Sequence, residues 1–264
     1  MQTPDITIVS LFLCSLLLFI PLAISIIFRL RIIRSTLWAV LRMVVQLVLI
    51  GIFLRYLFQF NNGILNVAWI FVMIFVATAN VINKTQLRFK VFVLPTLASF
   101  VIATLFVVLY FTGIVLRLDN IIDARYFVVI GGMLLGNSLR GDIIGIGNFY
   151  RAVRRNENRY LYHLACGATT MEALSPYFKE SFISALQPTI ATMATMGIVF
   201  LPGMMTGQIL GGVSPLLAIK YQIAIMIAIF VSTTIAINLT ILFTVRTCFN
   251  EYGIVRKTIF AQKQ

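Results

Sequence analysis

Seven long apolar runs, separated mostly by short polar connections, constrain this chain of 264 residues more than any other feature. A helix needs about 20 apolar residues to cross the hydrocarbon core of a bilayer, and every run reaches that length. We therefore predict an all-α integral membrane protein, a single transmembrane domain over residues 1–264 with about seven transmembrane helices. The runs cover residues 6–28, 36–58, 64–83, 91–116, 126–148, 188–212 and 218–245.

The composition places these runs in a membrane. Hydrophobic residues make up 60% of the chain and charged residues 11%, whereas soluble domains carry about a quarter charged residues. We expect a multi-pass protein of the cell's inner or plasma membrane, in contact with lipid. The net charge of +13 could suggest nucleic acid, but in so apolar a chain clustered Lys and Arg are more typical of cytoplasmic loops. No nucleic-acid partner is therefore expected.

Basic residues are distributed unequally between the two sides of the predicted spans. One side collects 17 Lys and Arg residues and the other only four, which are Arg55, Arg117, Arg125 and Lys220. In membrane proteins the cytoplasmic loops carry the excess of basic residues. The sequence therefore predicts an N-terminus outside the cell and a C-terminus in the cytoplasm.

The connection over residues 149–187 is the longest, and it alone has room for cytoplasmic machinery. Its pattern indicates two helices around a break. Gly167 suits the C-terminal cap of the first helix, and Thr169, with Glu172 three residues later, has the spacing of a capping box at the start of the second. The alternative interpretation is an amphipathic hairpin that lies on the membrane surface.

A short pattern occurs twice, as GGMLLGNSL at 131–139 and PGMMTGQIL at 202–210. Both copies place a carboxamide directly after the second glycine of a Gly-x-x-x-Gly spacing, and a rise of about 1.5 Å per residue puts them at similar depth in antiparallel helices. We predict a closely packed polar seam beside a pathway through the membrane. The alternative is plain helix packing, with bridging amides and methionine as filler. The seam residues are Gly132, Met133, Gly136, Asn137, Pro202, Gly203, Met204, Met205, Gly207 and Gln208.

Few other polar residues lie inside the predicted spans. Arg42 and Gln46 are four residues apart and share one helix face. Arg42 either snorkels to the membrane surface or meets a partner at similar depth, for which Asp142 in the fifth run is the best candidate. Arg42, Gln46 and Asp142 therefore form a candidate intramembrane polar cluster.

Several of these motifs resemble those of one protein family. The helix–Gly-Ala-Thr–helix pattern at 167–169 is similar to the coupling loop of ABC-transporter permeases, in which a short helix sits in a cleft of the ATPase subunit. The segments LPGMM at 201–205 and IKYQI at 219–223 look like those of FetB-type permeases. These are bacterial membrane subunits linked to iron export, with plant relatives linked to aluminium tolerance. Three further short motifs fit the same family: Gly132-Met133, Gly136-Asn137, and Arg42 with Gln46-Leu47.

The resemblance implies the permease subunit of an ABC transporter that exports iron or another metal ion. It assigns coupling to the ATPase to Gly167, Ala168, Thr169 and Glu172. The chain lacks the G-x-x-x-x-G-K-[ST] loop of an ATP-hydrolysing subunit, so ATP would bind a separate chain, with two permeases and two ATPases in the working unit. No catalytic or cofactor-binding residue is expected here. Metal ligands stay unassigned, because the methionine thioethers alone do not identify a metal.

Two other classes of protein remain open. A stand-alone secondary transporter of a small ion or solute usually keeps a carboxylate or histidine in mid-membrane, and Asp142, off-centre and beside Arg140, is the only acidic residue in the predicted spans. An intramembrane enzyme would need a cluster of acid, base, nucleophile or metal ligands, and no such cluster recurs within the spans. The substrate and the direction of transport cannot be read from these residues.

Overall fold

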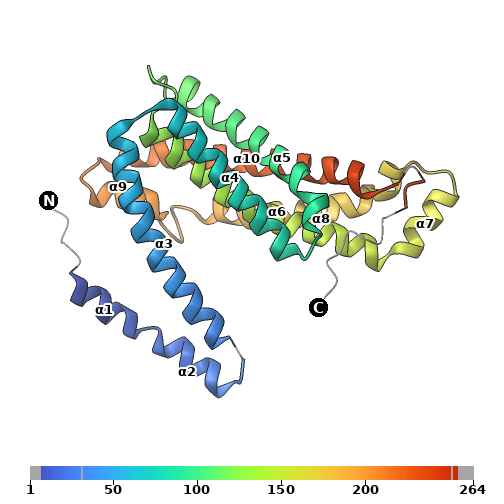
Figure 1. Cartoon of the computed structure of the whole chain (residues 1–264), viewed down its shortest axis with the longest axis horizontal. Coiled ribbons are helices and arrows are strands. Elements are labelled where there is room, and N and C mark those ends of the chain that lie inside the picture. Colours follow the sequence, from blue (N-terminus) through green and yellow to red (C-terminus); the bar gives the residue numbers. More distant parts are fainter. Residues whose placement is uncertain (1–6, 31, 251, 255–264) are drawn as a thin grey trace.

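The computed structural model describes residues 7–30, 32–250 and 252–254, and within these ranges it contains helices and no strands (Figure 1). The prediction of an all-α membrane protein is confirmed. In chain order the elements are α1 (Ile8–Leu16), α2 (Phe19–Ile27), α3 (Ile33–Phe60), α4 (Gly63–Thr85), α5 (Phe89–Tyr110), the π-helical η1 (Phe111–Val115), α6 (Ala124–Arg155), α7 (Glu157–Ala165), α8 (Thr170–Thr195), α9 (Gly203–Leu210) and α10 (Pro215–Cys248).

Six stretches of the described chain are long and apolar enough to cross a membrane. α1 and α2 together form the first, and α5 with η1 forms the fourth; the others are α3, α4, α6 and α10. Each overlaps one of the predicted runs. α6 and α10 contain 32 and 34 residues, so at about 1.5 Å per residue they exceed a hydrocarbon core of about 30 Å. Their ends therefore project beyond the bilayer.

The predicted span at 188–212 is discontinuous and not a single helix. α8 ends at Thr195, residues 196–202 are non-helical, and α9 begins at Gly203. The break has local causes: Gly197 adopts a φ of +84°, and Pro202, which has no N–H to donate, directly precedes α9. α8 and α9 follow one another along α10, which runs in the opposite direction (Figure 1).

The long connection predicted at 149–187 is almost entirely helical. α6 continues to Arg155, α7 follows, and α8 then includes every residue from Thr170 onward, with Pro176 and Pro188 inside it. The two helices around a break are confirmed. The second of them continues into the helix that packs along α6 and α10, so the hairpin is joined to the bundle and is not a separate surface element.

The helical core consists of α4, α5, α6, α8 and α10. α6 and α10 are in close contact where α6 carries glycine. A Cβ on Gly141 would lie 2.6 Å from Cγ2 of Thr233, and one on Gly145 would lie 3.0 Å from Cγ2 of Ile237. The absence of a side chain at these two positions therefore sets the spacing of the two helices.

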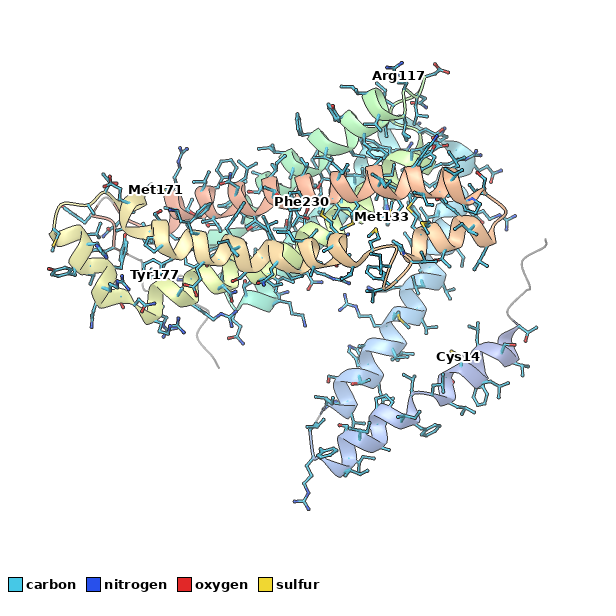
Figure 2. The ribbon with its side chains drawn as sticks, turned by 180° about the vertical axis from the view of Figure 1, so that it is seen from behind. Cys14, Arg117, Met133, Met171, Tyr177 and Phe230 are labelled. Atoms are coloured by element: carbon cyan, nitrogen blue, oxygen red, sulfur yellow. The ribbon has the colours of Figure 1, made fainter. Side chains whose placement is uncertain are left out.

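α1, α2 and α3 extend away from this core (Figures 1 and 2), and we call them the N-terminal arm. None of the residues in the apolar window of α3 is buried. The arm meets the core near the end of α3, where Leu57 is buried and the ring of Phe53 lies 4.0 Å from that of Trp69. The remaining apolar surface of the arm requires lipid or another protein around it.

Candidate functional site

A cavity of about 260 Å³ lies between α6, α8 and α10. Its polar lining comes from Asn137 and Arg140 on α6 and from Thr189 and Thr192 on α8, with Met226 of α10 among its apolar residues. Arg140 lies about 24 Å along α6 from the first residue, at about 1.5 Å per residue. Because α6 has 32 residues, or about 48 Å at this rise, Arg140 and the cavity lie near the middle of the helix.

The polar side chains of the cavity keep unused hydrogen-bonding capacity. Asn137 Nδ2 donates to the carbonyl oxygen of Met133 at 2.8 Å, and the Thr192 hydroxyl donates to the carbonyl oxygen of Pro188 at 2.8 Å. Both bonds stay within one helix, so the oxygens of the two side chains remain free to accept. Arg140 is exposed and forms no ion pair with any described residue.

Two buried amide oxygens lie near the break between α8 and α9. Gln208 on α9 and Gln222 on α10 each have a side-chain oxygen that accepts no hydrogen bond from the described residues. The Gln222 amide nitrogen lies 3.7 Å from the sulfur of Met196, directly after α8. An unsatisfied buried polar group costs about 1–3 kcal/mol, so a hydrogen-bond donor from water, a ligand or a partner would stabilise these two oxygens.

Gln222 was not among the candidate residues of the sequence analysis, although it lies in the segment IKYQI. The available signal was a lone amide in an otherwise apolar helix, and such residues are uncommon and often functional within membranes. Only the fold shows that its side chain is directed at the non-helical segment that follows α8. The sequence pattern had paired Gln208 with Asn137 instead.

The structure does not bring the glycines of the predicted seam together. A Cβ on Gly132 would lie 2.9 Å from Cε of Met73, so Gly132 packs against α4. A Cβ on Gly136, Gly203 or Gly207 would meet no described atom within 4 Å. α6 therefore approaches α4 closely at Gly132 and α10 at Gly141, and the glycines of α9 make no such contact with it.

The other seam residues surround the discontinuity. Pro202 precedes α9, Met204 is half-buried against the core and Met205 is buried. Met133 of α6 lies at the same level along the long axis as the connection between α8 and α9 (Figure 2). The two copies of the pattern do not pack face to face, and their equal depth in the membrane stays a prediction.

The candidate polar cluster is divided between two separate places. Arg42 and Gln46 are exposed on α3 of the N-terminal arm. Asp142 is fully buried, and its Oδ2 accepts a hydrogen bond from the Thr240 hydroxyl on α10 at 2.8 Å. Within the described chain Arg42 and Asp142 form no ion pair, because the arm carries Arg42 away from α6.

A line of buried hydroxyl groups accompanies Asp142 between α6 and α10. Ser138 and Ser232 lie 3.2 Å apart, and Thr244 donates to the carbonyl oxygen of Thr240 at 2.7 Å. Asp142 Oδ1 accepts no hydrogen bond from the described residues. A charged carboxylate at such a place is costly in a membrane and is usually functional.

The turn between α7 and α8 has the predicted capping geometry. Gly167 adopts a φ of +89°, which a glycine accepts without steric cost, and the N–H of Ala168 donates to the carbonyl oxygen of His163 at 3.1 Å. Thr169 and Glu172 form a complete capping box. Two hydrogen bonds that the Glu172 carboxylate accepts in this box lower its pKa. The bond from the Thr169 N–H has the larger effect and the bond from the Thr169 hydroxyl the smaller.

The chain that follows α10 is attached to this turn. The hydroxyl of Tyr160, a buried residue of α7, donates to the carbonyl oxygen of Gly253. A Cβ on Gly253 would lie 2.9 Å from the Thr170 hydroxyl oxygen, so the backbone after α10 fits closely against the start of α8. Burial raises the pKa of Tyr160 to about 12, so the phenol keeps the proton that it donates even at alkaline pH. The turn and the end of α10 are therefore mechanically connected.

The described chain is a bundle of apolar helices with a discontinuous span, a polar cavity and two buried amide oxygens that accept no hydrogen bond from it. These features define a multi-pass helical membrane protein of the transporter class. Among the described residues no group of three or more His, Cys, Asp and Glu is placed to hold a metal ion. The chain belongs to UPF0014, an uncharacterised protein family, which it matches over residues 8–249. The family assignment expected from the motifs is confirmed.

Named relatives come from bacteria and plants. The chain is 27% identical over 251 residues to "Probable iron export permease protein FetB" of Escherichia coli, with 95% of both chains covered. It is 30% identical over 230 residues to "UPF0014 membrane protein YjkA" of Bacillus subtilis, covering 86% of this chain and 89% of that protein. It is 32% identical over 194 residues to "Protein ALUMINUM SENSITIVE 3" of Arabidopsis thaliana, covering 72% and 68% respectively. No solved structure matches it.

Proposed function

We propose that the chain is the membrane-spanning permease subunit of an ABC transporter that exports iron or another metal ion, driven by ATP hydrolysis on a separate chain. The name of the Escherichia coli relative, which matches over 95% of both chains, refers to iron export. The name of the Arabidopsis relative refers to aluminium. Both names support a role connected with metal ions.

The turn between α7 and α8 is the observation that carries this proposal. Gly167 and Thr169 are exposed, and α7 lies at one end of the molecule (Figure 1). α8 continues without interruption from this turn to Thr189 and Thr192 of the cavity. Thr189 lies about 30 Å along α8 from the turn, so an ATPase that displaces the turn would act on one wall of the cavity through a single continuous helix.

A second copy of the chain and two ATP-hydrolysing chains would complete the working unit. The exposed N-terminal arm offers a large apolar surface for association within the membrane, and such helix association uses close packing and not the hydrophobic effect. No catalytic residue or cofactor is assigned to the permease, because ATP would bind the partner chain.

Purification of the native complex tests the proposal. We expect an ATPase of the ABC class to co-purify, and its ATP turnover to rise in the presence of the transported metal ion. Gly167→Trp should reduce the coupling of ATP turnover to transport. Gly167→Ala is the control, because alanine introduces the backbone strain of a positive φ without the large side chain of tryptophan. Wild-type transport by Gly167→Trp in an intact complex would contradict the assignment of this turn.

One observation favours a second function, a stand-alone secondary transporter. Asp142 is buried inside a span and one of its carboxylate oxygens accepts no hydrogen bond from the described residues, and intramembrane carboxylates often mark ion pathways. Transport in proteoliposomes distinguishes the two functions. Uptake driven by an ion gradient without ATP, and abolished by Asp142→Asn, would establish the secondary transporter; transport that needs ATP and the partner chain excludes it.

A further inference from the structure

One charged group lines the cavity between α6, α8 and α10, and it is the guanidinium of Arg140. Arg140 forms no ion pair with the described residues. Arginine keeps its proton under all conditions that proteins tolerate, and an unpaired charge at membrane depth is retained only at a cost. The site therefore carries a fixed positive charge that the described protein does not neutralise.

The neighbouring polar groups suit an anion that accepts several hydrogen bonds. The hydroxyls of Thr189 and Thr192 are one helical turn apart on α8, and the amide of Asn137 lies on α6 one turn before Arg140. A guanidinium presents its N–H groups as a planar fork that matches carboxylate and phosphate oxygens. The remaining lining, which includes Gly141 and Met226, contributes no carboxylate.

We propose that this cavity binds a carboxylate- or phosphate-bearing anion through Arg140, so that a transported metal ion enters it as an anionic complex and not as a bare cation. The second clause rests on the proposed function. A bare metal cation would meet the positive charge of Arg140, and the cavity lining offers it no carboxylate. An anionic chelate reverses the sign of that interaction.

The size of the cavity fits a small ligand. Its volume of about 260 Å³ corresponds to roughly nine water molecules at about 30 Å³ each. A tricarboxylate such as citrate, or inorganic phosphate, fits within that space. A lipid phosphate offers the same chemistry, so a lipid headgroup is the second possible source of the anion.

Binding to the purified full-length chain tests the proposal directly. The chain is placed in nanodiscs of phosphatidylcholine, and binding of citrate, ferric citrate, inorganic phosphate and Fe²⁺ alone is measured by equilibrium dialysis. We expect saturable binding of at least one anion, weakened tenfold or more by Arg140→Gln and weakened by added salt. Nanodiscs that contain phosphatidylglycerol distinguish the two sources of the anion. If this lipid competes with the soluble anion, the natural ligand is a headgroup; if it does not compete, the natural ligand is the soluble anion.

Matched variants separate binding from folding. Arg155→Gln removes an exposed arginine from the same helix, outside the cavity lining, and should bind the anion as the wild type does. Thr189→Val and Thr192→Val together should weaken binding severalfold without a change of charge, and Arg140→Lys should retain part of the affinity. The proposal is overturned if no anion binds, if Arg140→Gln and Arg155→Gln bind equally, or if Fe²⁺ alone is the ligand that binds.

This assay contains no ATPase, so the two proposals fail independently. Loss of anion binding in a chain that still co-purifies with an ATPase rejects the anion site alone. Anion binding by a chain that transports without any ATPase rejects the ABC permease alone.

Discussion

At the scale of single residues, glycines that look alike in the sequence have different structural roles. Gly141 allows the close contact of α6 with α10, whereas the space next to Gly136 is empty. Gly167 and Gly197 instead provide a positive φ, in the turn before α8 and in the break after it. The sequence spacing favoured Gly136 and Gly207 as packing positions, because a Gly-x-x-x-Gly motif is a frequent contact. The structure assigns that role to Gly141.

Gly141→Ala should destabilise the protein, while Gly136→Ala serves as its matched control. The new Cβ at 141 would lie 2.6 Å from Cγ2 of Thr233 and 2.9 Å from Cδ1 of Ile237, and such overpacking costs about 1–3 kcal/mol. Alanine at 136 meets no described atom and should be neutral or stabilising by up to about 1 kcal/mol. Unfolding of both purified variants measures this difference. An equal loss in Gly136→Ala would indicate that another chain covers that face.

The capping box at the start of α8 should depend on pH through Glu172. The folded state lowers the pKa of this carboxyl, so the stabilisation is complete above the pKa of an unfolded glutamate. It is lost as the pH falls through the lower folded value. The free energy of unfolding is compared between the wild type and Glu172→Gln, which can accept the same hydrogen bonds without ionising. We expect their difference to shrink toward acid pH, and a constant difference would refute the linkage.

At the scale of secondary-structure elements, the discontinuity between α8 and α9 is the main feature. Non-helical backbone is tolerated within a membrane where it is covered by protein or lines a cavity. Residues 196–202 form some of their backbone hydrogen bonds within the segment, since the N–H of Gly197 donates to the carbonyl oxygen of Phe200 at 2.9 Å. The buried oxygens of Gln208 and Gln222 lie on the helices next to this break. A pathway through the protein would most easily form here.

Replacing amides tests whether this region lines the pathway. Gln208→Leu and Asn137→Leu should each reduce transport while the protein still assembles with the proposed ATPase. If the amides only bridge helices, the loss of stability should be small, since such hydrogen bonds average about 0.6 kcal/mol in membranes. Transport and thermal stability are measured on the same preparations. A stable double variant with wild-type transport would reduce the predicted seam to a structural role.

The contact between α7 and the chain after α10 offers a second test at this scale. Tyr160→Phe removes the hydroxyl that donates to the Gly253 carbonyl oxygen, and a hydrogen bond of this kind contributes about 0.5–1.5 kcal/mol. We expect faster hydrogen exchange in α7 and, under the proposed function, weaker coupling between ATP hydrolysis and transport. Phe249, whose ring lies 6.0 Å from that of Tyr160, stays unchanged. Unaltered exchange in α7 would show that the hydroxyl does not hold this helix.

At the scale of the whole molecule, the core of α4–α6, α8 and α10 contrasts with the exposed N-terminal arm. The loop at Arg117 and the start of α8 at Met171 lie toward opposite ends of the helical core (Figure 2). The asymmetry of 17 against four basic residues predicts that the end with Met171 is cytoplasmic. This orientation stays a prediction, since the fold itself does not define the two sides of the membrane.

Cysteine labelling in intact cells tests the orientation. In a background without Cys14, Cys166 and Cys248, Arg117→Cys should react with an impermeant reagent and Met171→Cys should not. Both positions are exposed, so a difference reports sidedness and not burial. Permeabilised cells provide the control in which both positions react. Labelling of position 171 alone would invert the topology.

Local patterns determined the helical class, six of the spans and the capped turn at Thr169. These features depend on contacts between residues close in sequence: a run of apolar side chains, or a carboxylate three residues from its cap. Family membership was also readable from short segments such as LPGMM. The sequence could not separate Pro188, which remains inside α8, from Gly197 and Pro202, where the helix is interrupted.

Tertiary structure decided which polar residues meet. Asp142 is bonded to Thr240, ninety-eight residues later, while its predicted partner Arg42 is carried away on the N-terminal arm. Gln222 reaches Met196, and Arg140 joins two threonines of α8 around one cavity. Such pairings depend on the rotation and spacing of packed helices, which small residues like Gly141 set. The spacing of apolar residues in a single sequence shows which residues share one face of a helix, but it does not show which other helix packs against that face.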